Sequence, residues 1–182
     1  WYECAFELKT QSDIWRRDIE INSNQGEQFG SPLVYPYFYP FVYGGQNTIA
    51  VDITNIGRDT GCEISIKNTN ELGNIVNPSW ILEHSYLDQL SQKVDELQYA
   101  KFNIQLQPGR TLIVDSGTLT QRAIVKNDEG TIYENVRNSE EINFDYIDYI
   151  VLKNGANKIY FNIGVGNTAD ISLKYCEMRE LI

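Results

Sequence analysis

The chain has 182 residues, with 42% hydrophobic and 22% charged side chains, which suits one folded domain, or one domain with a piece of a neighbour attached. Its formal net charge of −10, from 15 Lys and Arg against 25 Asp and Glu, argues against nucleic acid as a partner, because binding to phosphates needs a basic surface. The longest apolar stretches, such as Tyr146–Leu152, fall far short of the ~20 residues that span a bilayer, so membrane insertion is not expected. No signal peptide is predicted, and the start at Trp1 rather than at a Met leaves room for an upstream portion.

Alternation of apolar and polar residues with a period of two recurs along most of the chain and predicts β-strands. Strands are expected at Tyr2–Leu8, Ile14–Ile21, Thr48–Thr54, Cys62–Lys67, Phe102–Leu106, Thr111–Asp115, Arg122–Lys126, Tyr146–Leu152, Lys158–Ile163 and Ile171–Tyr175. Turn signals separate them at Asn55–Gly57, Gln107–Gly109, Asn127–Gly130 and Asn154-Gly155, and the last of these is expected to close a hairpin. This pattern is typical of an all-β fold, an antiparallel two-sheet β-sandwich or a partly closed barrel.

The stretch Ser31–Tyr43 has the most unusual composition in the chain, with three prolines and six aromatic residues. The prolines favour an extended conformation and exclude a central strand. Two interpretations stay open: a linker that lies along its own domain, or a strap between domains or subunits. A domain boundary is predicted near Gly44-Gly45, where regular alternation begins.

A single segment, Glu83–Leu97, breaks the period of two. Its apolar residues Leu87, Leu90, Val94 and Leu97 have helical spacing and predict one short helix, or a helical excursion between two strands. Such a helix would either pack on the edge of the sandwich or contact a neighbouring subunit.

Candidate catalytic and metal-binding residues are few. Cys4, Cys62 and Cys176 have no short spacing, so they are interpreted as reduced, mostly buried thiols, and no metal or cofactor is expected. His84, the only histidine, is interpreted as a surface or capping residue of the expected helix. The acidic groups Glu140-Glu141 and Asp145/Asp148 flank turns and are read as solvated surface, and no phosphate-binding or hydrolase motif occurs.

A succession of motifs begins at Trp15–Ile21 and continues through the aromatic Tyr35–Phe41. Its most telling part is Leu106–Ser116, which is similar to an L-x-x-G-x-T-L-x-I-D-S strand-turn-strand. Further members are Asn55–Gly57, Glu63–Ile66, Asn77-Pro78, Ala123–Gly130, Tyr149–Gly155 and Asn157–Phe161. Their order resembles the distal tail (Dit-type) proteins of long-tailed phages, the siphophages, and of phage-tail-like particles.

The resemblance implies an N-terminal belt domain that forms a ring, followed by a galectin-like, jelly-roll-like β-sandwich. Residues 1–44 would be the end of the belt domain, a β extension with the linker, and residues 45–182 the sandwich. It also implies a ring of copies, hexameric in the family, contacts with other tail proteins, and a place at the tail tip of the virion after assembly in the cytoplasm of a bacterial host.

Three classes of function follow. The leading expectation is a structural subunit of a tail tip or baseplate that joins the tail tube to tail-tip or receptor-binding proteins. Its interface is expected to use Trp15, Tyr35, Tyr37, Phe38, Tyr39 and Phe41. The second is a carbohydrate-binding module for host-surface glycans, whose stacking residues would come from Trp80, Tyr86, Tyr133 and Tyr149, each of which could equally be a core residue. An enzyme acting on cell-wall glycan is the weakest of the three, so the chain is not expected to be an enzyme.

Overall fold

The computed structural model describes residues 14–23, 48–87, 93–117, 121–127, 129–139 and 149–180. These residues form thirteen strands, β1 to β13, and one short 3-10 helix, η1 (Arg137–Ser139), and they contain no α-helix. Every strand pairing in them is antiparallel.

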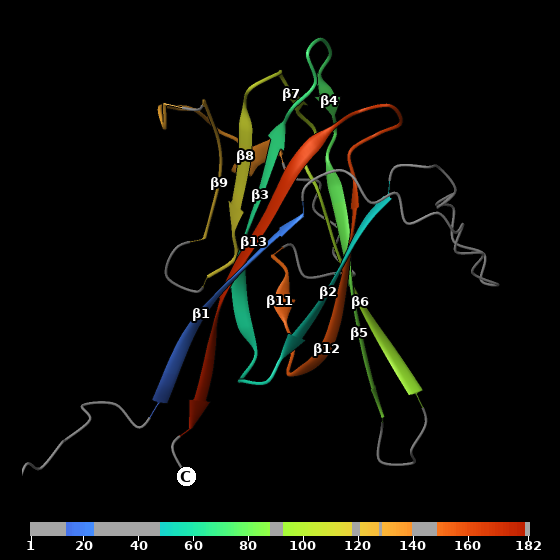
Figure 1. Ribbon diagram of the computed structural model, residues 1–182, viewed down its shortest axis with the longest axis vertical. Coiled ribbons are helices and arrows are strands. Elements are labelled where there is room, and N and C mark those ends of the chain that lie inside the picture. Colours follow the sequence, from blue (N-terminus) through green and yellow to red (C-terminus); the bar gives the residue numbers. More distant parts are fainter. Residues whose placement is uncertain are drawn as a thin grey trace, which may run out of the picture.

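Two sheets form the two layers of a sandwich (Figure 1). The seven-stranded sheet has the order β1 (Ile14–Ser23), β13 (Ala169–Glu180), β3 (Thr60–Asn68), β8 (Thr111–Asp115), β9 (Arg122–Lys126) and β10 (Ile132–Asn135), with β11 (Val151–Leu152) paired to the start of β3. The four-stranded sheet has the order β2 (Thr48–Asn55), β12 (Gly155–Asn162), β5 (Ser79–Leu87) and β6 (Lys93–Lys101). A small ladder of β4 (Ile75–Val76) and β7 (Gln105–Leu106) lies at the end drawn uppermost in Figure 1.

The core lies between the sheets and follows the alternation of each strand. In β3, residues 60, 62, 64, 66 and 68 are buried while the residues between them are half-exposed. Trp80 has 1% of its surface exposed, and its ring lies 5.6 Å from that of Phe102 and 6.2 Å from that of Phe161. Burial of apolar side chains from both sheets in one cluster is the main stabilising contribution to such a sandwich. The predicted all-β antiparallel sandwich is confirmed.

Asparagine and aspartate side chains end five of these strands in the same way. In each case the side-chain Oδ1 accepts a hydrogen bond from the backbone N–H two residues further on, at 2.9 to 3.1 Å. The residues are Asn55, Asn68, Asp115, Asn135 and Asn162. Such Asx-turns replace the next hydrogen bond of the ladder and turn the chain out of the sheet, so these residues set where the strands stop.

The strand predictions agree with the structure over most of the described chain. Thr111–Asp115 and Arg122–Lys126 coincide with β8 and β9, and the turn at Asn127–Gly130 joins β9 to β10. The predicted strand at Phe102–Leu106 is shorter than expected, because its regular part is the two residues of β7. Asn154-Gly155 does not close a hairpin, because β11 pairs with β3 whereas β12 pairs with β2 and β5. That turn carries the chain from one sheet to the other.

The helix predicted at Glu83–Leu97 is wrong. Residues 83–87 and 93–97 are strand residues of the hairpin β5–β6, paired from Ser79 opposite Lys101 to Leu87 opposite Lys93. Leu87 and Leu97 belong to two different strands, so their helical spacing has no structural meaning. The correct period of two is that of Trp80, Leu82, His84 and Tyr86 along β5. Packing of that alternating face on the core outweighs the helix propensity of the segment.

Several predictions fall on other parts of the chain. The strand at Tyr2–Leu8, the aromatic stretch 31–43, the acidic groups at 140–148 and Cys4 lie outside the described residues. The domain boundary near Gly44-Gly45 stays a prediction. Strand β1, which precedes it, pairs with β13 over its full length, from Ile14 opposite Glu180 to Ser23 opposite Ile171.

Candidate functional site

Two turns lie next to each other at the upper end of the sandwich, one following β3 (residues 69–74) and one between β12 and β13 (residues 163–168). We call them the paired turns. Asn70 joins them: its Nδ2 donates to Asn167 Oδ1 at 2.9 Å, and its Oδ1 accepts from the backbone N–H of Thr168 at 2.7 Å. A backbone hydrogen bond from Thr69 N to Thr168 O at 3.1 Å adds a third contact. The two turns therefore form one hydrogen-bonded unit.

Asn68 anchors this unit to the core. The side chain is fully buried, and its Nδ2 donates to the carbonyls of Leu106 at 2.7 Å and Gly73 at 3.0 Å. Its Oδ1 accepts from the N–H of Asn70 at 2.9 Å. A buried amide with several partners holds its neighbours strongly, because the loss of either side leaves unsatisfied polar groups away from water. Asn68 thus fixes the shape of the first turn and the position of the second.

Large aliphatic side chains stand at the tips of the paired turns. Leu72 is 91% exposed and Val165 is 83% exposed, and Val76 of the adjacent β4 is 53% exposed. Covering a leucine or valine stabilises a contact by roughly 1.5–3 kcal/mol relative to leaving it in water. Because hydrogen bonds already hold these turns, a partner that covered the tips would order few further residues. The paired turns are therefore held by hydrogen bonds and carry exposed aliphatic side chains at their tips.

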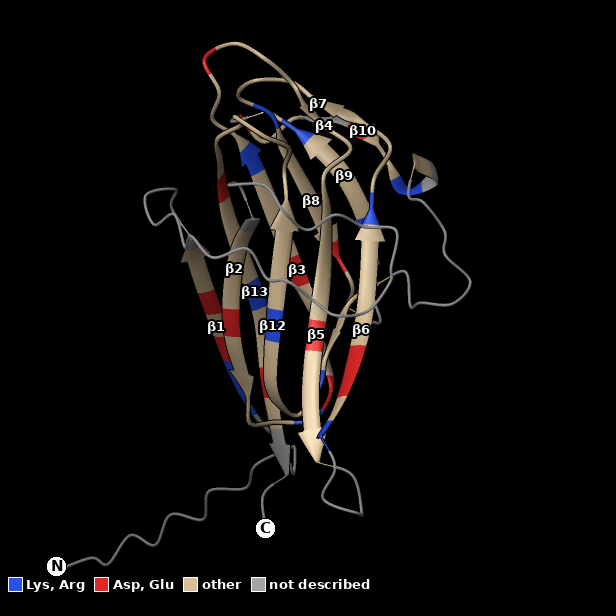
Figure 2. Cartoon of the chain, turned by 90° about the vertical axis from the view of Figure 1, so that its right-hand side faces the viewer, with Lys and Arg blue, Asp and Glu red and all other residues tan. Residues whose placement is uncertain are grey.

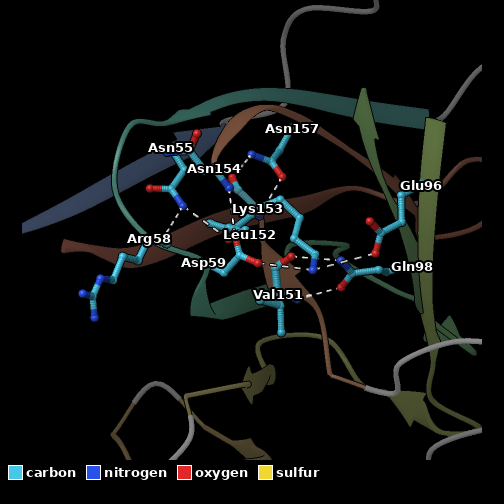
Figure 3. A network of polar contacts seen from close by, with 10 residues as sticks. All are labelled: Asn55, Arg58, Asp59, Glu96, Gln98, Val151, Leu152, Lys153, Asn154 and Asn157. Carbon is cyan, nitrogen blue, oxygen red and sulfur yellow. Dashed lines mark hydrogen bonds and ion pairs between the residues drawn. The ribbon is translucent and has the colours of Figure 1, made fainter. Parts of the chain in front are cut away.

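The lower end of the sandwich is held by a polar network instead (Figure 3). Lys153 Nζ lies 3.2 Å from Asp59 Oδ2 and 3.9 Å from Glu96 Oε1. Gln98, which is 1% exposed, donates to the carbonyl of Val151 at 3.0 Å and accepts from its N–H at 2.7 Å. The network ties the β2–β3 turn and the β11–β12 turn to β6.

The outer face of the seven-stranded sheet carries a row of charges on five neighbouring strands. Glu20, Lys174, Glu63, Asp115 and Arg122 stand opposite one another in register. Lys174 lies 3.6 Å from Glu20, and Arg122 lies 3.0 Å from Glu63 and 3.8 Å from Asp115. A shallow hollow of about 470 Å³ lies along part of this row. Because Lys174 and Arg122 both pair with carboxylates of the same row, the row is a cross-strand ladder of ion pairs.

The two described cysteines are free thiols. Burial raises the pKa of Cys62 to about 12, a hydrogen bond with Ser116 opposes this shift, and the charge of Asp115 adds to it. Ser116 accepts from the N–H of Cys62 at 2.8 Å and donates to the carbonyl of Ile150 at 2.6 Å. Burial, followed by the hydrogen bond and charge of Asp18, also raises the pKa of Cys176. Neither thiol has the lowered pKa of an activated cysteine; Cys62 is buried as predicted, whereas Cys176 is half-exposed.

His84 is not the surface or capping residue that the sequence predicted. It lies in β5 with 6% of its surface exposed, and its Nδ1 donates to the carbonyl of Ala156 at 2.9 Å. Its ring stacks on that of Tyr86 at 5.6 Å. The error follows from the wrong helix, since a strand turns this side chain toward the core side of the sheet.

The structure describes the side chains of three of the four residues predicted for sugar stacking. Trp80 and Tyr149 are buried, which is the alternative to sugar stacking that the sequence left open. The guanidinium of Arg137 lies over the ring of Tyr149, 5.9 Å from its centre. Tyr86 is 44% exposed on the β5–β6 hairpin. Tyr133 lies in β10, but its side chain is outside the described part.

Of the predicted interface residues, Trp15 lies in β1 opposite Arg179, and its side chain is not among those described. The remaining five, Tyr35, Tyr37, Phe38, Tyr39 and Phe41, fall outside the described residues. Four residues of the paired turns were not predicted from the sequence: Asn68, Asn70, Leu72 and Val165. A signal existed in Asn68-Thr-Asn70, because asparagines at the end of an alternating run favour turns.

Within the described ranges, no three His, Cys, Asp or Glu residues gather in a way that could hold a metal ion. The same ranges contain no helix of the length and hydropathy needed to cross a membrane. Comparison with known protein families, characterised proteins and solved structures finds no match to the chain.

Proposed function

We propose that the chain is a structural subunit of a phage tail tip or baseplate, which links the tail tube to tail-tip or receptor-binding proteins. The order of sequence motifs is the basis for the tail assignment, and an antiparallel β-sandwich is the fold that this resemblance implies. The observation that carries an assembly role is the pair of turns with Leu72 and Val165 exposed at their tips. Preformed apolar tips of this kind favour contact with another folded surface.

The partner proposed for the paired turns is a second copy of the chain. The proposed contact is heterologous: the turns of one copy meet a different surface of the next, and repeated contacts of this kind close into a ring where the rotation between neighbouring copies closes. The lower end suits such a contact less well, because the charges of Asp59, Lys153 and Glu96 would have to lose water.

Light scattering on the full-length protein, together with negative-stain images, tests this function. We expect a native mass of several copies and ring-shaped particles. A monomer over the whole concentration range, in protein that contains any upstream domain, would contradict the assembly role.

A second candidate function is the recognition of a host-surface glycan. The observation that favours it is a pair of half-exposed tyrosines, Tyr160 and Tyr99, which stand in one cross-strand row with Ile81 on the outer face of the four-stranded sheet, at positions other than those that the sequence suggested.

A further inference from the structure

We propose that the solvent face of the four-stranded sheet binds a neutral, extended β-linked glycan, with Tyr99 and Tyr160 as stacking residues. This inference goes beyond the assembly role. It rests on the second candidate function and gives that function a site and a class of ligand.

The strand register sets the aromatic residues in one row across the sheet. Tyr160 of β12 stands opposite Ile81 of β5, which in turn stands opposite Tyr99 of β6. All three side chains are half-exposed, whereas the residues that follow them along the strands, such as Phe161 after Tyr160, are buried in the core. The alternation of the strands therefore directs the two tyrosines and Ile81 away from the core.

The spacing of the row suits a chain of sugars. Two strand separations place Tyr160 and Tyr99 about 10 Å apart. Alternate sugars of an extended β-linked chain are separated by a similar distance, and the apolar C–H face of each sugar stacks well on an aromatic ring. The intervening Ile81 supplies apolar surface beneath the middle sugar. The row thus offers three successive contacts to one linear ligand.

Polar groups lie in the next row, where the hydroxyl edges of the sugars would be. This row contains Asp52, Lys158 and Glu83 in register on β2, β12 and β5. Figure 2 faces this sheet and shows the blue band of β12 between red bands on β2 and β5. On the other side of the aromatic row stand Asn162 of β12 and Lys101 of β6. Carboxylate, amide and ammonium groups together provide both acceptors and donors for hydroxyl groups.

The polar neighbours also hold Tyr160 in place. Its hydroxyl donates to Glu83 Oε2 at 3.2 Å, and Lys158 Nζ lies 5.5 Å from the centre of its ring. Lys158 Nζ lies 3.5 Å from Asp52 Oδ1 as well. A ring fixed in this way loses little conformational freedom when a ligand stacks on it.

The charges of this face favour a neutral ligand. Lys158 pairs with Asp52, and Lys93 pairs with Asp95 at 3.0 Å, so these acids and bases largely balance. The chain as a whole carries a net charge of −10, which would repel an anionic glycan. Specificity would therefore come from stacking and hydrogen bonds rather than from net charge.

Isothermal titration of the full chain with cellohexaose and with chitohexaose, two neutral β-1,4-linked hexamers, tests the site. We expect at least one of them to bind, and we expect Tyr160→Ala and Tyr99→Ala each to weaken binding about tenfold or more. Tyr160→Phe keeps the ring and should retain most of the affinity. The matched control is Tyr86→Ala, which removes an exposed tyrosine outside the row and should leave the affinity unchanged. Thermal unfolding of every variant checks the fold.

The native mass of the same variants separates this inference from the assembly role. If Tyr160→Ala loses glycan binding and keeps the wild-type mass, the face is a glycan site. A loss of mass in Tyr99→Ala and Tyr160→Ala would instead make this face a contact between copies and would overturn the inference. Binding of neither hexamer at millimolar concentration, or equal affinity in Tyr160→Ala and wild type, would also overturn it, whatever the native mass.

Discussion

The two ends of the sandwich are each closed around a fully buried asparagine, but they differ in the other groups that hold them. At the upper end, Asn68 and Asn70 join the turns through neutral amide and backbone hydrogen bonds. At the lower end, Asn55 plays the corresponding part by donating to the carbonyl of Arg58 at 2.9 Å, and the rest of the network includes the ion pairs of Lys153.

Which end suits a contact with another protein depends on this difference. Neutral hydrogen bonds that are satisfied within the chain need no further partner, so the electrostatic cost of covering the paired turns comes from the exposed Glu71 next to Leu72. Charged side chains at the lower end are half-exposed and keep part of their hydration, which a dry contact would remove. Exposed aliphatic side chains stand at both ends, but Leu72 and Val165 at the upper end are more exposed than Leu87 and Ile56 at the lower end.

The largest effect is expected from Asn68→Ala at the upper end. The substitution removes two donors and one acceptor, and it leaves the buried carbonyl of Leu106 without this partner, so we expect the free energy of unfolding to fall by about 3 kcal/mol. Urea denaturation measures the loss. Asn103→Ala, at an exposed position, is the matched control and should change the stability by less than about 0.5 kcal/mol. A change as small as that of the control would show that Asn68 does not anchor the paired turns.

The lower end should be sensitive to Gln98→Ala to a smaller degree. The buried amide makes both of its hydrogen bonds to the backbone of one residue, Val151, and their loss should lower the free energy of unfolding by about 2 kcal/mol. Gln107→Ala, at an exposed position in a turn, is the control for the same urea measurement. Hydrogen exchange should rise at Val151 and the neighbouring amides, and unchanged protection there would contradict the role of Gln98.

A still smaller effect is expected from Lys153→Met. The ion pairs of Lys153 with Asp59 and Glu96 are partly exposed, so their loss should lower the free energy of unfolding by less than about 1 kcal/mol. Because salt screens such pairs, the difference from wild type should shrink further as sodium chloride is added. Lys126→Met is the control. A loss that does not depend on salt would mean that packing of the side chain, and not its charge, supports the lower end.

The smallest effect concerns Asp95 in the β5–β6 hairpin. A hydrogen bond from Ser85 at 2.6 Å, followed by Lys93, lowers the pKa of this carboxyl below its ordinary value of 3.8. A carboxyl whose pKa is lower in the folded chain stabilises the fold above its ordinary pKa, and the contribution disappears as the pH falls through the lowered value. The hairpin should therefore loosen in strong acid, while the neutral hydrogen bonds of Asn68 do not titrate.

Ser85→Ala tests this assignment by carboxyl NMR titration. We expect the pKa of Asp95 to move back toward 3.8 in this variant, because the largest cause of the shift has been removed. Ser65→Ala, on the other sheet, should leave it unchanged. Titration of Asp95 at its ordinary value in the wild-type protein would show that the hydrogen bond contributes nothing in solution.

Much of the architecture could be predicted from residues alone. Alternation located most of the strands, and the turn at Gln107–Gly109 is present, with Gly109 at a φ of 75° and a hydrogen bond from Arg110 N to Gln107 O. These features are local, so a single sequence carries their signal. The hairpin β5–β6 was missed, because leucines from its two strands have helical spacing when they are read as one segment.

The candidate sites depend on contacts between distant residues. Asn70 meets Asn167 and Thr168 only because β3 and β13 are neighbours in the sheet, and Tyr160 meets Ile81 only because β12 pairs with β5. Alternation can place a side chain on one face of a strand, but it does not state which strands pair. For this reason the sequence pointed to Trp80, which is buried, rather than to Tyr99 and Tyr160.

The most direct test of the assembly role compares the native mass of three proteins by light scattering: the wild type, the double variant Leu72→Ser/Val165→Ser, and Ile56→Ser. The double variant removes both tips of the paired turns, and Ile56→Ser is the matched change of an exposed aliphatic residue at the lower end. We predict that wild type and Ile56→Ser have the mass of several copies and that the folded double variant has a smaller mass. An unchanged mass in the double variant would contradict the claim that the paired turns hold neighbouring copies together.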